Sequence, residues 1–297
     1  MNRVSRIDRR ALFTTGAAAA VLAAAGISAE AEPRRGGRLR MALSGAGRSD
    51  SFDTRRSQGL FMQVAGAGTV FDTLTEVAAD GTLRGELATG WEGSADARSW
   101  TLTLREGVRF HDGAAFTAHD VRASFDLHRD SGLDAVRRIE ILSDHRIRVD
   151  FDRPSPQFPF LLSDARFVIY PHRRLEDAMA WGIGTGLYKV RRCQPGRDLI
   201  AERVAEHYKD GHAGWFDEVE LVSIPKAEVR AEALRGRYVD VADLADAQGL
   251  DRASDFALLP DAQTMTQAAQ PGVRFPRLMG RALPLDNLRA AERWWMA

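Results

Sequence analysis

The chain has 297 residues, of which 44% are hydrophobic, enough for one large domain or two ordinary domains with real cores. It has 41 basic and 41 acidic residues. A protein that binds nucleic acid through phosphate contacts usually has an excess of basic residues, so the composition argues against that class. Cys193 is the only cysteine, so no intramolecular disulfide can form and no zinc site is indicated. We therefore expect an ordered globular protein without a nucleic-acid partner.

The first 31 residues have the pattern of a cleavable export signal. Basic residues precede an alanine-rich run, and Ala29 and Ala31 stand in the A-x-A register of a cleavage site. The pair Arg9-Arg10, followed by Leu-Phe, resembles a twin-arginine signal, with an ordinary Sec signal as the alternative. The run is shorter and less apolar than a membrane-spanning helix. We predict a signal peptide over 1–31 and periplasmic localisation in a bacterium.

The mature chain expected after cleavage begins at Glu32. Without the four arginines and two acidic residues of the signal, it holds 37 basic and 39 acidic residues. This small negative charge suits a soluble periplasmic protein.

The first half of the mature chain combines a short strand, a helix and a sheet. "RLRMAL" at 38–43 alternates and predicts a strand that enters a Gly/Ser-rich loop. A helix is expected at about 60–74. The strict alternation of 100–104 predicts a half-buried antiparallel strand, with Glu106-Gly107 as a turn and 108–110 returning beside it.

The second half continues the mixture of strands and helices. Thr117 and Asp120 form a capping-box pattern at the start of a helix. Sequence patterns predict a strand from Arg146, a short buried run at 167–171, a hairpin over 184–204, a strand at 218–224, and a helix that ends near Gly236 before another strand. Because these elements lack regular βαβ spacing, we predict a mixed α/β (α+β) fold built on separate sheets.

Two motifs suggest chemistry but have simpler interpretations. The pairs His111-Asp112 and His119-Asp120 could be metal ligands, but the first pair falls at a turn and Asp120 is explained by the helix N-terminus. "GIGTG" at 182–186 has the glycine density of a phosphate loop, yet it runs into a strand and not a helix. A tight turn fits better, and we predict no metal and no cofactor.

No motif in the sequence indicates catalysis. The chain contains no G-x-S-x-G elbow, no P-loop lysine and no H-E-x-x-H segment. A secreted mixed α/β chain without a catalytic motif is more often a binding protein, so we predict that it is not an enzyme.

A longer pattern resembles a known family. The stretch from Val70 to Leu127, "VFDTLTEVAADGTLRGELATGWEGSADARSWTLTLREGVRFHDGAAFTAHDVRASFDL", looks like the signature of family 5 extracellular solute-binding proteins, the peptide- and nickel-binding group of ABC importers. "GTGLYKV", with Leu187 where proline is usual, "EHYKDGHAGWFDEVELVSIP" and "ALRGRYVDVADL" extend the resemblance. It covers about Gly36 to Leu244.

The resemblance implies a fold and a function. The fold is a periplasmic binding protein-like lobe over 32–282, with a small inserted subdomain at about 70–180. The function is capture of a small polar solute, such as a peptide, between two lobes that close by a hinge motion, and delivery to ABC permease subunits. In peptide-binding relatives, main-chain hydrogen bonds hold the peptide backbone, while Asp and Arg side chains hold its charged termini.

The chain departs from the family near its end. "LPLDNLRAAERWWMA" at 283–297 resembles the beginning of the second lobe, and we expect this lobe to be largely missing. The expected helix carrying Trp294 and Trp295 would then pack back on the first lobe, stay exposed or meet a protein partner. This leaves an alternative function, a degenerate binding lobe that acts as a protein-interaction module without transport.

The resemblance also suggests ligand-binding positions. The loop after the first strand resembles the family's loop that lends backbone groups to ligand, and it comprises Ser44, Gly45, Ala46 and Gly47. Trp181, which precedes the GTG turn, is either an aromatic side chain that faces the cleft or a core residue.

Overall fold

The structure is a computed structural model that describes residues 35–56, 59–77, 82–244, 256–258 and 273–276. For the last two ranges it describes the backbone alone. The predicted signal peptide and the expected Trp294–Trp295 helix lie outside the described residues. None of the helices in the described ranges combines the length and the apolar character needed to cross a membrane.

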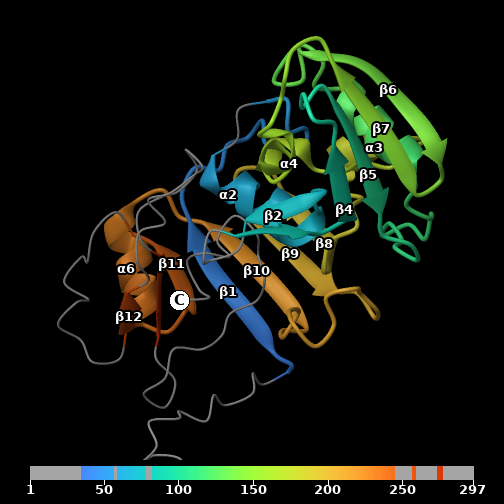
Figure 1. Ribbon diagram of the computed structural model, residues 1–297. Helices are drawn as coiled ribbons and strands as arrows, with labels where there is room; N and C mark the ends of the chain where they lie inside the picture. Colours follow the sequence, from blue (N-terminus) through green and yellow to red (C-terminus); the bar gives the residue numbers. More distant parts are fainter. Residues whose placement is uncertain (1–34, 57–58, 78–81, 245–255, 259–272, 277–297) are drawn as a thin grey trace, which may run out of the picture. The chain divides into compact units, whose positions relative to one another are not determined.

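The larger sheet has seven strands with β1 (Arg38–Leu43) at its centre (Figure 1). This strand pairs in parallel with β10 (Glu218–Ser223) on one side and with β11 (Val241–Asp243) on the other. The remaining strands extend the sheet with antiparallel pairing; they are β9 (Asp198–Arg203) and β8 (Tyr188–Gln194) beyond β10, and β13 (Val273–Pro276) and β12 (Phe256–Leu258) beyond β11. The predicted strands at 38–43 and 218–224 and the predicted hairpin over 184–204 are confirmed.

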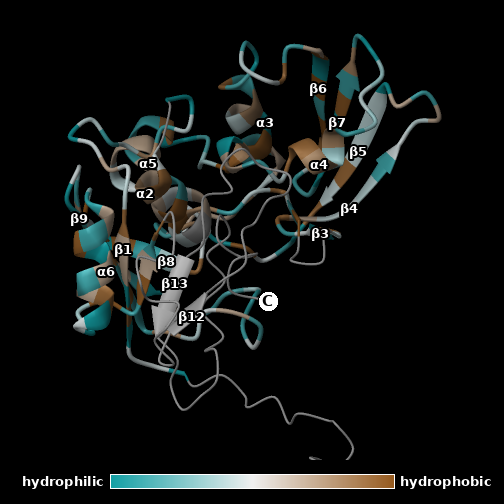
Figure 2. Ribbon diagram, turned by 90° about the vertical axis from the view of Figure 1, so that its left-hand side faces the viewer, coloured by the Kyte–Doolittle hydropathy of each residue, from teal (hydrophilic) through white to brown (hydrophobic). Residues whose placement is uncertain are grey.

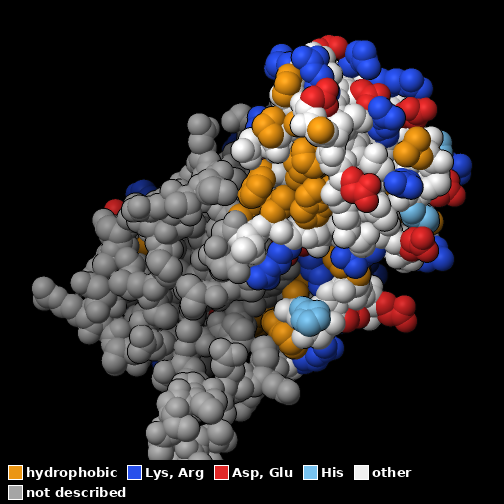
Figure 3. All heavy atoms as spheres, in the orientation of Figure 1, with side chains coloured by type: hydrophobic (Ala, Val, Ile, Leu, Met, Phe, Trp, Pro, Cys, Tyr) orange, Lys and Arg blue, Asp and Glu red, His pale blue; other side chains and the backbone are white. Residues whose placement is uncertain are grey.

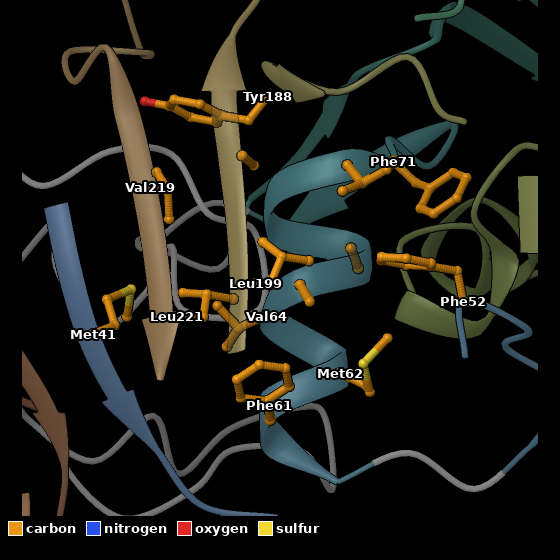
Figure 4. Close-up of a cluster of buried hydrophobic side chains, with 14 of the residues drawn as sticks. Met41, Phe52, Phe61, Met62, Val64, Phe71, Tyr188, Leu199, Val219 and Leu221 are labelled. Atoms are coloured by element: carbon orange, nitrogen blue, oxygen red, sulfur yellow. The ribbon is translucent and has the colours of Figure 1, made fainter. Parts of the chain in front are cut away.

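A helical segment covers one part of this sheet. Helix α2 (Leu60–Gln63) continues as a π-helix, η1 (Val64–Val70). Figure 4 shows Phe61 and Val64 of this segment among the sheet residues Met41, Leu199 and Leu221, all of them buried. The helix is shorter than the predicted 60–74, because Phe71 adopts an extended conformation and its N–H donates to the Gly66 carbonyl at 2.9 Å.

A second sheet contains four antiparallel strands. Its order is β4 (Ala88–Gly93), β5 (Ser99–Leu104), β7 (Arg146–Phe151) and β6 (Val136–Ser143). Leu102 and Leu104 are buried while Thr103 is exposed, as the alternation predicts. The predicted return of 108–110 along β5 is wrong, because β4 and β7 occupy both edges of that strand.

Helix α3 (Ala118–Asp126) packs beside this second sheet (Figure 2). Its buried Val121 and Phe125 join Leu102 and Ile147 in one apolar core. The Asp120 carboxylate accepts a hydrogen bond from the Thr117 backbone N–H at 2.7 Å, which completes the predicted capping box. The carboxylate of Asp120 is therefore used to start the helix.

Shorter elements lie between the strands of the two sheets along the chain. They are β2 (Thr75–Val77) and β3 (Leu83–Gly85), which form a two-stranded ribbon, α4 (Phe158–Leu161), the 3₁₀ turn η2 (Ala165–Phe167), α5 (Leu175–Trp181) and α6 (Ala227–Arg235). Helix α6 ends before Gly236, as predicted. The run 167–170 is buried but forms no strand. With three sheets and interspersed helices, the mixed α/β prediction is confirmed.

The predicted turn before β8 is held by direct backbone packing. A Cβ atom added to Gly184 would lie 2.0 Å from the Val70 carbonyl oxygen, and one added to Gly186 would lie 2.5 Å from that of Thr69. The Gly186 N–H also donates to the Val70 carbonyl at 2.9 Å. The glycines of "GIGTG" thus allow the turn to approach the end of η1, and the segment runs into β8 as expected for a turn and not for a phosphate loop.

This packing predicts the effect of adding one methyl group. We expect Gly184→Ala to lower the free energy of unfolding by about 3 kcal/mol, because the clash is with backbone that cannot easily move. Gly90→Ala in β4 is the matched control, since an added Cβ there meets nothing within 4 Å. Urea unfolding of both variants measures the difference, and equal stabilities would contradict the packing argument.

Candidate functional site

The carboxyl ends of three parallel strands meet at one edge of the larger sheet. Because β1 runs parallel to both β10 and β11, the residues that follow them are brought together. These are Ser44 after β1, Ile224 after β10, and Asp243 at the end of β11. Ligands of open α/β sheets commonly bind at the carboxyl ends of strands. This edge is therefore our candidate site.

The loop Ser44–Gly47 leaves β1 and packs against the start of α2. The Ser44 carbonyl accepts a hydrogen bond from the Phe61 N–H at 3.1 Å. Gly45 has a φ of +79°, and its carbonyl oxygen would lie 1.9 Å from a Cβ at Gly59. Two glycines are thus needed for this close contact, one for its backbone angle and one for its lack of a side chain.

Both ends of the loop are anchored by carboxylates. The Ser44 hydroxyl donates to the carboxylate of Asp243, which is 4% exposed. The Gly47 N–H donates to the Asp50 carboxylate at 2.8 Å. Between these anchors, the backbone N–H groups of Gly45 and Ala46 make no hydrogen bond within the described part of the chain. They are two donors on a fixed backbone.

Trp181 is on the surface. Its residue is 71% exposed, so the core interpretation is wrong. It is the last residue of α5 and is followed by Gly182 in the left-handed conformation. The same helix end contacts the connection after the candidate loop, because the Phe52 N–H donates to the Met179 carbonyl at 2.9 Å. No described contact joins Trp181 to Ser44–Gly47, so its place in the site stays a prediction.

The two His-Asp pairs have structural contacts. Asp120 accepts from the N–H and the Nδ1 of His172 at 2.8 and 2.7 Å, in addition to its role in the capping box. Asp112 pairs with Arg174 at 3.2 Å. Within the described ranges, no three His, Cys, Asp or Glu residues are grouped as metal ligands would be.

His111 binds the turn before β8. Its Nε2 lies 2.8 Å from the Gly186 carbonyl, while the Gly184 N–H donates to its Nδ1 at 3.4 Å. A ring that donates through Nε2 and accepts at Nδ1 is neutral. Burial lowers the pKa of His111 from its usual value, so the structure favours the neutral form.

A buried charged cluster also contacts this turn. Lys209 is 8% exposed, forms a close ion pair with Glu86, and lies 3.6 Å from the Asp72 carboxylate. Thr185 donates its hydroxyl to Asp72 at 3.0 Å, and the His207 Nε2 is 2.9 Å from the Thr185 carbonyl. The sequence analysis missed this cluster, although its members stand in the stretches that carry the family resemblance.

Neither Cys193 nor the outer surface of the second sheet indicates other chemistry. Burial raises the pKa of the Cys193 thiol to about 11, so it stays protonated and unreactive near neutral pH. Side chains of both charges are mixed on the surface of β4–β7, as Figure 3 shows, and Arg148 pairs with Asp150 there at 2.9 Å. A mixed surface of this kind is typical of a solvated face.

These features define a class of protein: a mixed α/β binding protein whose candidate site is made by loop backbone at the carboxyl ends of parallel strands. Comparison with known proteins agrees. The family described as "Bacterial extracellular solute-binding proteins, family 5 Middle" matches residues 82–290. The chain belongs to family 5 of the bacterial extracellular solute-binding proteins, as the sequence resemblance indicated.

The individual relatives have low sequence identity to this chain, and their own chains are longer. The Escherichia coli "Probable D,D-dipeptide-binding periplasmic protein DdpA" is 25% identical over 54% of this chain and 34% of its own length. The nickel-binding periplasmic protein of the same species is 28% identical over 58% of this chain and 35% of its own length.

Among solved structures, the binding protein AgaA of A. tumefaciens R10, in complex with agropinic acid, is 27% identical with a TM-score of 0.69. The match covers 75% of this chain and 48% of AgaA. The chain thus spans about half or less of the length of these relatives, and the shared fold is that of one part of a periplasmic binding protein.

The contacts of His111 predict a dependence of stability on pH. The folded-state pKa is below the unfolded value of about 6.5. As pH falls through 6.5, the unfolded state binds a proton that the folded state resists, so stability is lost on acidification. We expect His111→Gln, which keeps a donor near the Nε2 position, to be less stable at pH 7.5 but to lose less stability between pH 7.5 and 5.

Thermal unfolding across this pH range measures the effect. His212→Gln, a change at an exposed histidine, is the control. Its stability should change with pH as that of the wild type does. If the stability of His111→Gln changed with pH as steeply as that of the wild type, the pKa of His111 would not differ between the folded and unfolded states.

Proposed function

We propose that this chain is a solute-binding component of an ABC importer and that its solute is a peptide or a similar small polar molecule. Its membership of family 5 supports the general function. The loop Ser44–Gly47 supports the choice of solute, because its backbone geometry presents hydrogen-bond donors at the carboxyl ends of parallel strands.

The type of donor favours a peptide over a bare metal ion. Backbone N–H groups at Gly45 and Ala46 bind oxygen atoms, which a peptide supplies as carbonyls and a carboxylate. A nickel ion would instead need lone pairs from nitrogen, oxygen or sulfur. Binding of an extended peptide through main-chain hydrogen bonds also agrees with the relative whose name reports dipeptide binding.

The domain arrangement is part of the proposal. Residues 32–282 form the solute-binding lobe, and 70–180 act as an inserted subdomain. The separate four-stranded sheet supports this division. The proposed partners are a peptide-like solute, ABC permease subunits, and a further protein at Trp294–Trp295, which lie outside the described residues.

A thermal-shift screen tests solute binding. The probes are D-alanyl-D-alanine, L-dipeptides, agropinic acid and nickel ion, each up to millimolar concentration. A solute at 100 times its dissociation constant stabilises by about 2.7 kcal/mol, which raises the melting temperature by about 5 to 10 °C. We expect a shift with a peptide and none with nickel alone. No shift with any probe would favour the alternative, a protein-interaction module.

Paired aromatic variants then test the site. If Trp181 contacts solute, Trp181→Ala should weaken binding of the peptide that stabilises the wild type by about tenfold, since stacked aromatic side chains contribute at this scale. Tyr238→Ala is the matched control, because Tyr238 is 74% exposed and outside the proposed site. Equal affinities of the two variants would remove Trp181 from the site.

We also propose export through the twin-arginine route to the periplasm. The pattern at Arg9-Arg10 and the A-x-A site at Ala29–Ala31 support it. The expected periplasmic product begins at Glu32, and replacing both arginines by lysine should retain the precursor inside the cell. Mass spectrometry of periplasmic and cytoplasmic fractions measures this, and export of the double variant would favour the Sec alternative.

A further inference from the structure

Arg230 ties together the ends of two strands at the candidate site. Its side chain is almost fully buried, at 5% exposed. Nε donates to the Asp243 carbonyl at 2.5 Å, and Nη1 donates to the Ile224 and Pro225 carbonyls at 2.6 and 2.9 Å. One guanidinium therefore fixes the exits of β10 and β11.

Asp243 extends this network to the third strand. Nη2 of Arg230 lies 3.7 Å from the Asp243 carboxylate. That carboxylate accepts a hydrogen bond from the hydroxyl of Ser44, the first residue of the candidate loop. The exits of all three parallel strands are thus joined through two buried charged side chains.

Helix α6 holds Arg230 in this position. Its Ala231 and Leu234 pack with Ala42 of β1 and Ala242 of β11 in a small apolar core. Ala231, the neighbour of Arg230 in the chain, is therefore buried against β1 and β11. A planar fork of donors can serve several carbonyls at once, which a lysine ammonium on a flexible stem does less well.

We propose that Arg230, Asp243 and Ser44 are positioning residues that fix the loop Ser44–Gly47 for solute. Arg230 and Asp243 act through Ser44, since the guanidinium already serves three carbonyls and the carboxylate serves the serine hydroxyl. This inference rests on the proposed function, because it assigns a role to the loop in binding. It adds a mechanism: the network holds the two N–H groups of Gly45 and Ala46 in the positions from which they donate to an oxygen atom of the solute.

The first experiment measures the loop without any solute. Hydrogen exchange is followed by nuclear magnetic resonance in the wild type, Ser44→Ala and Ser44→Thr. It is measured at the two amides that hold the loop, Gly47, which donates to Asp50, and Phe61, which donates to the Ser44 carbonyl; their rates are called loop exchange below. We expect exchange about tenfold faster in Ser44→Ala, because the loop loses its anchor to Asp243. Ser44→Thr keeps a hydroxyl and should restore the wild-type rate.

A matched control separates positioning from a general loss of stability. Ser94 donates its hydroxyl to Asp96 at 2.6 Å in an exposed turn of the second sheet, and accepts from two backbone N–H groups. Ser94→Ala should lower the melting temperature without changing exchange in the loop or affinity for solute. Ser44→Ala should raise loop exchange and weaken binding of the peptide found in the screen about tenfold, in addition to the loss of stability from leaving the buried Asp243 carboxylate without its donor.

Arg230→Lys tests the other end of the network. It keeps a cation beside Asp243 but loses the fork, so loop exchange should rise as in Ser44→Ala while far-ultraviolet circular dichroism stays that of the wild type. Should Arg230→Lys not fold, the serine variants decide alone. Unchanged loop exchange in Ser44→Ala would overturn the positioning role.

The two proposals fail in different ways. If the wild type binds no probe, the proposed function fails, yet the exchange experiment still shows whether the network orders the loop. If the wild type binds a peptide and Ser44→Ala binds it equally well, the proposed function stands and the positioning role is wrong.

Discussion

The parallel pairing of β1 with β10 and β11 is the constraint on which the rest depends. It places Met41 opposite both Leu221 and Val241, which are far from Met41 along the chain. Parallel neighbours require long crossover connections, and the connection from β1 to β10 contains the whole second sheet. Because the pairing is parallel, three strand exits share one edge of the sheet. The candidate loop, the Arg230 network and its carbonyl acceptors are neighbours for this reason alone.

Several residues in the stretches that resemble the family meet beside the turn before β8. Asp72, Thr185 and Lys209 come from separate stretches of the resemblance and meet beside one turn. His111, from the loop after β5, binds the same turn from another direction. A buried cluster of charges is costly unless every member is paired, so these three stretches depend on one another in the folded chain.

Sequence patterns predicted the elements whose signal is local. The alternation around Leu102, the capping box at Thr117 and the glycine after α6 each depend on a few neighbouring residues, and each was confirmed. The partner of β5 was wrongly predicted, because "ATGWEG" in β4 has two glycines and no clear alternation, whereas 108–110 stood next in the chain. Strand pairing is decided by the tertiary core, which a local pattern does not contain. Arg230 was missed for the same reason: a charged residue on a helix is usually solvated, and only the tertiary fold surrounds it with the carbonyls of Ile224, Pro225 and Asp243.

The candidate loop shows why its anchors matter more than its side chains. Gly45 and Gly47 contribute no side chain, and Ser44 uses its hydroxyl on Asp243, so any solute would meet mainly backbone. A flexible glycine-rich loop would lose much conformational entropy when it closed on a ligand, and affinity would fall accordingly. Because the loop is anchored at Ser44 and at Gly47, it loses this conformational entropy during folding and not during binding. Gly45 then allows the close approach of the loop to Gly59, while the carboxylates of Asp243 and Asp50 make the loop rigid. The same backbone donors can serve solutes with different side chains, because main-chain recognition does not depend on them.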